Sequence, residues 1–192
     1  RTDGSSAGTF PVTHLPDPAA HIWRIAATAT HAFFFVEDVT FGQELWSTDG
    51  SAAGTRPVTD FGFHEPFGDN EYSSHLVAGD SRAFFFATDG IAGVQVWSAS
   101  SSSGSASPVV EVCPATYCSY DTWLETTGSQ LFFLREDPNL GTEVWTSDGT
   151  AAGTWALRDA CPGTCWGGGT VLATAVDKLV YAARESEVNQ ET

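Results

Sequence analysis

Short apolar runs, each followed by a polar turn, recur along the whole chain about every 48 residues. Runs of phenylalanine and leucine mark the same position in successive units, at residues 33–35, 84–86 and 131–134, and residues 179–181 mark it in a fourth. Consecutive apolar residues on a β-strand point to both faces of its sheet, so each run predicts a strand covered on both sides. No segment has the apolar spacing of an amphipathic helix, which predicts a chain nearly free of helix.

A tryptophan follows each of the first three runs at a nearly constant distance and marks a second strand. These tryptophans, Trp46, Trp97 and Trp145, lie 51 and 48 residues apart. Between each run and its tryptophan lies an Asp-x-x-x-Gly pattern, typical of a turn, which begins at Asp38, Asp89 and Asp137. Because three landmarks keep the same spacing, we infer an internal repeat that covers the whole chain.

Each repeat unit predicts four short strands, A to D, with turns between them. Strand B is the apolar run, strand C carries the tryptophan, and strand D follows a Gly-Thr pair, as at residues 56–60. Strand A is expected near Ile25, Leu76, Leu124 and Leu172. Four-stranded units with a period of ~40–50 residues are typical of propeller blades. The prediction is an all-β chain, a β-propeller of four four-stranded blades of about 48 residues.

The whole chain, residues 1–192, is predicted to be one propeller domain. Its repeat units are 1–46, 47–97, 98–145 and 146–192. The first residues match a strand D, and the last unit stops just before its tryptophan would fall. An N-terminal strand D can complete the last blade of a ring, so two forms stay open: a closed four-bladed ring, or part of a larger propeller.

The two best copies of the repeat motif begin at Glu44 and Glu143 and read Glu-Leu-Trp-Ser-Thr-Asp-Gly-Ser and Glu-Val-Trp-Thr-Ser-Asp-Gly-Thr. They resemble the ELWxxDGT repeat family of bacterial secreted and surface proteins. The third unit departs from the motif, with Ser100 and Ser101 where Asp and Gly are expected. The resemblance implies propeller-forming, extracellular repeat proteins without a shared catalytic site.

The charge balance narrows the choice of partners. The chain has 8 lysines and arginines against 24 aspartates and glutamates, a formal net charge of −16. This excess disfavours nucleic acid and anionic membranes as partners. No apolar run approaches the ~20 residues of a membrane-spanning helix, so no membrane insertion is expected. The composition, 42% hydrophobic and only 17% charged, excludes a disordered chain.

Four cysteines form two local pairs, each just after a strand D: Cys113 with Cys118, and Cys161 with Cys165. We expect two disulfides, each closing a small loop and contributing ~2 kcal/mol. Disulfides imply an oxidising compartment, and therefore a secreted or cell-surface protein. The alternative is a zinc site made by all four thiolates, which is disfavoured because equivalent positions on adjacent blades should lie too far apart.

The Asp-Gly pairs of the motif allow two interpretations. A calcium site needs several oxygen ligands, but each turn offers a single carboxylate, from Asp3, Asp49 or Asp148. Asp-Gly is also a common turn pair, because glycine accepts a positive φ and aspartate bonds to nearby backbone. The turn interpretation is preferred; no cofactor is expected, and calcium is the alternative.

Acidic residues at the ends of strands B and D are predicted to share one face of the propeller. Blade strands alternate in direction, so the D–A and B–C loops emerge on the same side. We expect a ligand to bind across this face, where Trp123 and Trp166 would stack on a sugar. The predicted ligand-binding residues are Asp60, Glu111, Asp159, Asp38, Asp89, Asp137, Trp123 and Trp166. The alternative is that the aspartates cap turns and both tryptophans are buried.

These features predict a non-enzymatic binding or scaffold module that engages carbohydrate or protein. No catalytic residue is predicted, because the five histidines share no metal spacing and no hydrolase motif or phosphate loop is present. Two alternatives stay open. One is a propeller enzyme that acts on polysaccharide through a pair of carboxylates. The other is a structural spacer whose partners are further repeats of the same parent chain.

Overall fold

The computed structural model describes residues 1–13, 15, 17–39, 42–61, 75–89, 91–113, 123–163, 167, 173–175 and 178–183. Every regular element among them is a β-strand, which confirms the prediction of an all-β chain. None of these segments forms a helix long and apolar enough to span a membrane.

The strands form three four-stranded antiparallel sheets and one hairpin. Sheet 1 contains β1 (His21–Ala27), β2 (Ala32–Asp38), β3 (Gly42–Thr48) and β4 (Arg56–Pro57). Sheet 2 contains β5 (Leu76–Ala78), β6 (Arg82–Ala87), β7 (Val94–Ser100) and β8 (Ala106–Cys113). Sheet 3 contains β9 (Leu124–Thr127), β10 (Gln130–Asp137), β11 (Gly141–Ser147) and β12 (Thr154–Ala156). The hairpin pairs β13 (Ala173–Ala175) with β14 (Lys178–Val180).

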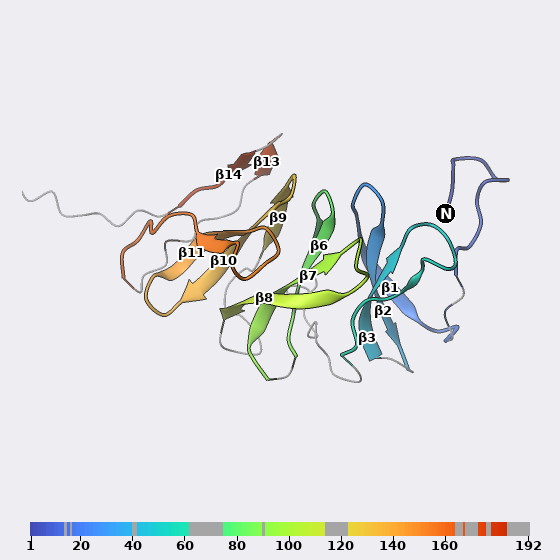
Figure 1. Cartoon of the computed structure of the whole chain (residues 1–192), viewed down its shortest axis with the longest axis horizontal. Helices are drawn as coiled ribbons and strands as arrows, with labels where there is room; N and C mark the ends of the chain where they lie inside the picture. The colour runs from blue at the N-terminus through green and yellow to red at the C-terminus, as the bar shows by residue number, and fades with distance from the viewer. Residues whose placement is uncertain are drawn as a thin grey trace, which may run out of the picture.

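Within each sheet the strands lie in chain order, as expected for strands A to D of a repeat unit. The sheets follow one another along a row, with sheet 1 at the right of Figure 1 and sheet 3 at the left. The first strands of successive sheets are in contact, β1 with β5 and β5 with β9, and β9 also contacts β13. The four-stranded sheet thus occurs three times, each time across a boundary between two of the predicted repeat units, and the last unit also contributes a two-stranded hairpin.

The described strands do not form a closed ring. The hairpin β13–β14 and strand β1 lie at opposite ends of the row in Figure 1, and no contact comparable to that of β1 with β5 joins them. No strand precedes β1 in the described residues. Instead, residues 1–10 form a loop whose ends are joined by two backbone hydrogen bonds between Arg1 and Phe10, of 2.9 and 3.0 Å.

The apolar runs are covered on both faces, as their sequence predicts. In sheet 2, Phe85 packs towards sheet 1 against Phe33 and Phe35, whereas Phe84 and Phe86 pack towards sheet 3. All five side chains are completely buried. Alternation along a single strand therefore fills two different intersheet layers, and these two layers make up most of the core.

The tryptophan of strand C always pairs with the middle of strand B. Trp97 lies opposite Phe85, and Trp145 lies opposite Phe133. Opposite residues of an antiparallel pair share a face, so Trp97 and Trp145 each face the preceding sheet. Trp97 accordingly packs in the layer between sheets 1 and 2, and Trp145 in the layer between sheets 2 and 3.

Cys113 and Cys161 are both buried, with 2% and 6% of their surface exposed. Their expected partners, Cys118 and Cys165, lie outside the described residues. The two disulfides and the oxidising compartment that they imply therefore stay predictions.

Candidate functional site

A pocket of about 490 Å³ opens where the end of sheet 1 meets sheet 2, which we call the first junction. Sheet 1 contributes Thr59, Asp60 and Phe61 from the segment after β4, and sheet 2 contributes Asp89 from its B–C loop and Trp97 from β7. Val58, Thr88 and Ala106 complete the lining. Two of the predicted ligand-binding residues, one from each sheet, thus meet in a single cavity. Its volume lies within the ~300–1,000 Å³ that is usual for ligand pockets.

A buried carboxylate holds the sheet 1 side of the pocket in place. Glu44, on β3, is only 3% exposed. Its oxygens accept hydrogen bonds from the Thr59 hydroxyl and, at 2.7 Å, from the Phe61 N–H. The Thr59 hydroxyl also accepts a hydrogen bond of 2.8 Å from the Leu45 N–H. Because the residues on either side of Asp60 are tied to β3, the exposed Asp60 is held at the mouth of the pocket.

The opposite side of the pocket is a turn closed by its own aspartate. Asp89 Oδ1 accepts hydrogen bonds of 2.9 Å from the N–H groups of Ile91 and Ala92. The Thr88 hydroxyl donates to the Ala92 carbonyl at 3.0 Å. The two N–H donors favour the charged form and lower the pKa of Asp89, so this carboxylate is ionised at neutral pH.

Aromatic rings form the apolar part of the pocket. Phe61 meets Trp97 edge to face, with ring centroids 5.0 Å apart and an interplanar angle of 81°. Trp97 in turn stacks on Phe85, which is completely buried. The Trp97 indole is therefore held in place by Phe85, and it offers a rigid surface beside two carboxylates and two threonine hydroxyls. Such a lining suits groups that donate hydrogen bonds and also have a flat or apolar face.

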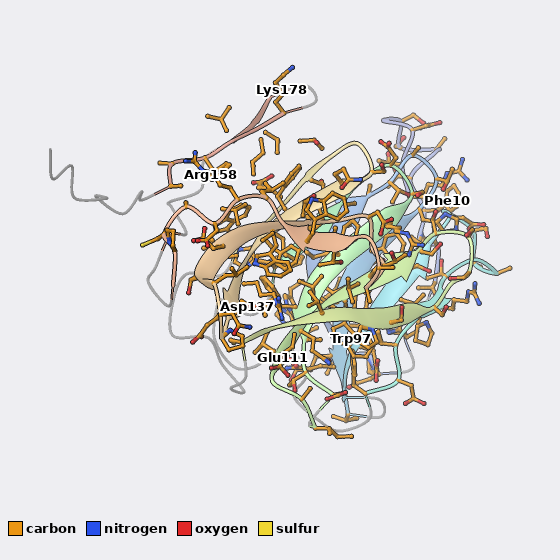
Figure 2. The ribbon with its side chains drawn as sticks, turned by 60° about the vertical axis from the view of Figure 1, so that its left-hand side comes forward. Phe10, Trp97, Glu111, Asp137, Arg158 and Lys178 are labelled. Carbon is orange, nitrogen blue, oxygen red and sulfur yellow. The ribbon has the colours of Figure 1, made fainter. Side chains whose placement is uncertain are left out.

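The boundary between sheets 2 and 3, which we call the second junction, brings together two more predicted residues. Arg135 Nη1 forms an ion pair of 2.9 Å with Asp137 Oδ2, and Arg135 Nε donates to the Glu111 carbonyl at 2.8 Å. The Arg135 guanidinium also lies over the Trp145 ring, with Cζ 4.2 Å from its centroid. Figure 2 shows Glu111, Asp137 and Trp97 along the same lower side of the molecule.

Asp137 caps its turn in the same way as Asp89. Its Oδ1 accepts hydrogen bonds from the N–H groups of Asn139, at 2.9 Å, and Leu140, at 3.3 Å. These bonds and the charge of Arg135 lower the pKa of Asp137. The turn-capping alternative is therefore correct for both aspartates, and Asp89 also lines the first-junction pocket.

Trp123 and Asp159 are not among the residues that line the first-junction pocket. Trp123 is 8% exposed and packs with Leu134 and Val144, so the expectation of an exposed stacking surface is wrong for this residue. Its burial follows from its position beside β9, where the third sheet and the C-terminal hairpin enclose it. Asp159 is exposed beyond β12. Asp38 ends β2 opposite Gly42, and Trp166 lies outside the described residues.

The Asp-Gly turns use their carboxylates internally. Asp49 Oδ1 accepts hydrogen bonds from the Ser51 N–H and hydroxyl, at 2.8 and 2.7 Å. The same two bonds recur at Asp3 and Asp148, and they lower the pKa of all three aspartates. Within the described ranges, no group of three His, Cys, Asp or Glu side chains gathers as metal ligands would.

Sequence reasoning missed the two buried acids of the repeat motif, Glu44 and Glu143. Glu143 is 1% exposed, and its Oε1 accepts a hydrogen bond of 3.1 Å from the Cys161 N–H. Gly167 covers this carboxylate so closely that a Cβ there would lie 2.1 Å from Oε1. Burial raises the pKa of Glu143. The available signal was the acid two residues before each of two motif tryptophans, on a strand already expected to be buried.

Comparisons with known proteins add little to this description. No protein-family model and no curated protein matches the chain. Among solved structures, TolB from Acinetobacter baumannii is similar over 72% of this chain, at 13% identity and a TM-score of 0.45. A puromycin hydrolase S511A mutant complexed with PGG is similar over 74%, at 10% identity and a TM-score of 0.47. The chain covers 32% and 21% of the length of these two proteins.

Proposed function

We propose that this chain is a β-propeller binding module of a secreted or cell-surface protein, of the ELWxxDGT repeat type, that engages carbohydrate or protein. The observation that carries the proposal is the pocket at the first junction. It unites Asp60 and Asp89, which repeat spacing selects independently, with a fixed tryptophan on the D–A and B–C side.

The exposed face of sheet 1 supports a propeller in which another blade covers this end of the row. Ile25 pairs with Phe34 as Leu124 pairs with Phe133, so the two residues occupy equivalent places facing a preceding sheet. Leu124 is 3% exposed because sheet 2 covers it, whereas Ile25 is 73% exposed. The face of sheet 1 therefore has the composition of a blade interface. Closure of a four-bladed ring and docking of further repeats would each cover it.

The directions in which the carboxyl pKa values shift favour a binding function over hydrolysis. A glycosidase needs one carboxyl kept protonated by a raised pKa next to a second, ionised one. Burial raises the pKa of Glu143, but this carboxyl lies beneath Gly167 and away from the pocket. Asp89 in the pocket shifts in the opposite direction.

The test compares Asp60→Asn with Glu111→Gln against panels of glycans and peptides. Both residues are exposed acids at the same position of their repeats, but only Asp60 lines the pocket. The wild type should bind at least one ligand class, and Asp60→Asn should weaken that binding about tenfold or more, whereas Glu111→Gln should not. An absence of binding across both panels, or equal affinity in the two variants, would contradict the proposal.

A further inference from the structure

We propose that the first-junction pocket binds a guanidinium group, presented as an arginine side chain of a partner protein. The inference rests on the proposed function, because it takes this pocket as the ligand site, and it specifies the chemistry of the ligand. Its source is the second junction, where the chain fills the equivalent place with an arginine of its own.

The two junctions are built from equivalent positions. Counted from the tryptophan of each unit, Asp89 corresponds to Asp137, since each lies eight residues before it. The strand-D acid, Asp60 or Glu111, lies 14 residues after the tryptophan of the preceding unit. Both loop aspartates cap their turn through Oδ1, at distances of 2.9 to 3.3 Å. Trp97 and Trp145 face the preceding sheet in the same register. The capping carboxylate and the indole are thus common to both junctions, and an acid of the preceding repeat lies at the same sequence position beside each.

Several lining positions differ between the two junctions, and one of them supplies a guanidinium. Ten residues before the tryptophan, sheet 3 has Arg135 and sheet 2 has Ala87. Arg135 uses all the common parts: its Nη1 pairs with Asp137, its Nε bonds to the Glu111 carbonyl, and its plane covers Trp145. Ala87 is 2% exposed and has no side chain beyond Cβ to reach this place. The first junction therefore keeps the receptor for a guanidinium but lacks the guanidinium.

The chemistry of the pocket favours guanidinium over other cations. Its planar fork can pair with a carboxylate while its face stacks on an indole, which an ammonium cannot do to the same degree. Hydrogen bonds from the turn N–H groups lower the pKa of Asp89, which favours its charged form. Asp60 adds a second carboxylate at the mouth, and the net charge of −16 attracts cationic partners from a distance.

The direct test titrates the full chain with N-acetyl-arginine amide and with N-acetyl-citrulline amide by calorimetry. Citrulline has nearly the same shape but no charge. We expect the arginine probe to bind one site, at least about tenfold more tightly than the citrulline probe, and to bind less tightly as salt is raised. Asp60→Asn should weaken binding, and Glu111→Gln serves as the control on the same face.

Two variants should reverse which of the two junctions can bind the arginine probe. Ala87→Arg should place a guanidinium over Trp97 and block the probe. Arg135→Ala should open the second junction, so that the stoichiometry rises from one site to two. Arg135 is partly exposed, so its truncation should leave the fold intact, which circular dichroism can verify.

The outcomes separate this inference from the proposed function. If a glycan binds in a manner that depends on Asp60 while both amide probes fail, the pocket is a ligand site but the guanidinium assignment is wrong. Equal affinity for arginine and citrulline probes, or an unchanged stoichiometry in Arg135→Ala, would also overturn it. If nothing binds in an Asp60-dependent way, both proposals fail.

Discussion

At the scale of single residues, the acid of the repeat motif acts as an anchor for the loop that follows strand D. Glu44 holds Thr59 and Phe61, and Glu143 holds the N–H of Cys161. A buried carboxylate with N–H donors is stable only while those donors remain in place, because an unpaired buried acceptor is costly. The motif therefore couples a strand inside the sheet to a loop at the rim, where Asp60 lines the first-junction pocket.

Glu143 gives this anchor a pH dependence that can be measured. Burial raises its pKa, so its contribution to stability is fully present below the ordinary glutamate value of 4.5 and is lost as pH rises through the folded-state pKa. Glutamine cannot ionise. The free energy of unfolding of Glu143→Gln should therefore increase relative to the wild type as pH rises through that window. Urea unfolding across a pH series measures this difference.

Asp137→Asn is the control, because the pKa of Asp137 is lowered and the sign reverses. The stability that Asp137 contributes is present above its ordinary value of 3.8 and is lost as pH falls through the folded-state pKa. The wild type should thus lose its advantage over Asp137→Asn only in acid. A pH-independent difference for Glu143→Gln would show that the raised pKa is not a property of the folded chain.

At the scale of elements, the turn between strands C and D is the most regular part of the repeat. Besides the two bonds to aspartate, the Gly54 N–H donates to the Ser51 hydroxyl at 3.0 Å, and the Thr55 hydroxyl donates to the Ser51 carbonyl at 2.7 Å. The same bonds recur in the loops at residues 1–10 and 147–154. This network leaves no space for a side chain at the second glycine, since a Cβ on Gly54 would lie 2.1 Å from Asp49 Oδ1.

Gly54→Ala should therefore displace the Asp49 carboxylate from its donors and destabilise the fold by about 1–3 kcal/mol. Ala53→Ser, at an exposed neighbour in the same turn, should change stability by less than ~0.5 kcal/mol. Thermal and urea unfolding of the two variants give the comparison. If Gly54→Ala matches Ala53→Ser, the close packing of this turn does not hold in solution.

The sequence was informative about elements wherever local chemistry decides them. Apolar runs predicted β2, β6 and β10, and the motif tryptophans predicted β3, β7 and β11. Strand D was harder to predict, because its extent depends on backbone donors: β4 has only two residues, and its Pro57 has no N–H to donate. Residues 1–9 form the turn of the repeat motif, but the strand D expected after Gly8 and Thr9 is not seen among the described residues, because no partner strand lies beside that segment.

At the scale of the whole molecule, the location of the first-junction pocket depended on long-range packing. Repeat spacing selected Asp60, Asp89, Glu111 and Asp137 alike, because it reports position within a unit. Which junction is open depends on Ala87 and Arg135, two residues that no motif distinguishes. The burial of Trp123 could not be predicted from the repeat either, because it is decided by the side chains of sheet 3 and the hairpin that pack on this residue.

The two ends of the row are expected to meet, within one chain or between chains. Ile25 is 73% exposed at the first end, and Val180 is 58% exposed at the last. In the variant with Ile25→Cys and Val180→Cys, a short thiol crosslinker should join these positions, because both belong to faces that resemble blade interfaces. A monomeric product identifies a closed ring, and a ladder of larger products identifies docking between chains.

The matched control replaces Val180 by Ile91, whose side chain is 94% exposed in the B–C loop of sheet 2, away from the blade faces. The variant with Ile25→Cys and Ile91→Cys should crosslink far less. Equal crosslinking in the two variants, or none in the first, would contradict the completion of the propeller.

The first junction has Ala87 where the second has Arg135. A single substitution at this position can therefore set how many ligands the chain binds. Each junction between sheets either contains its own arginine or accepts one from outside. In an array of such sheets, the number of open junctions would determine how many arginine side chains can be held at once. Because linked sites act at a high effective concentration, opening one more junction would raise the avidity for a multivalent partner much more than the affinity of any single site.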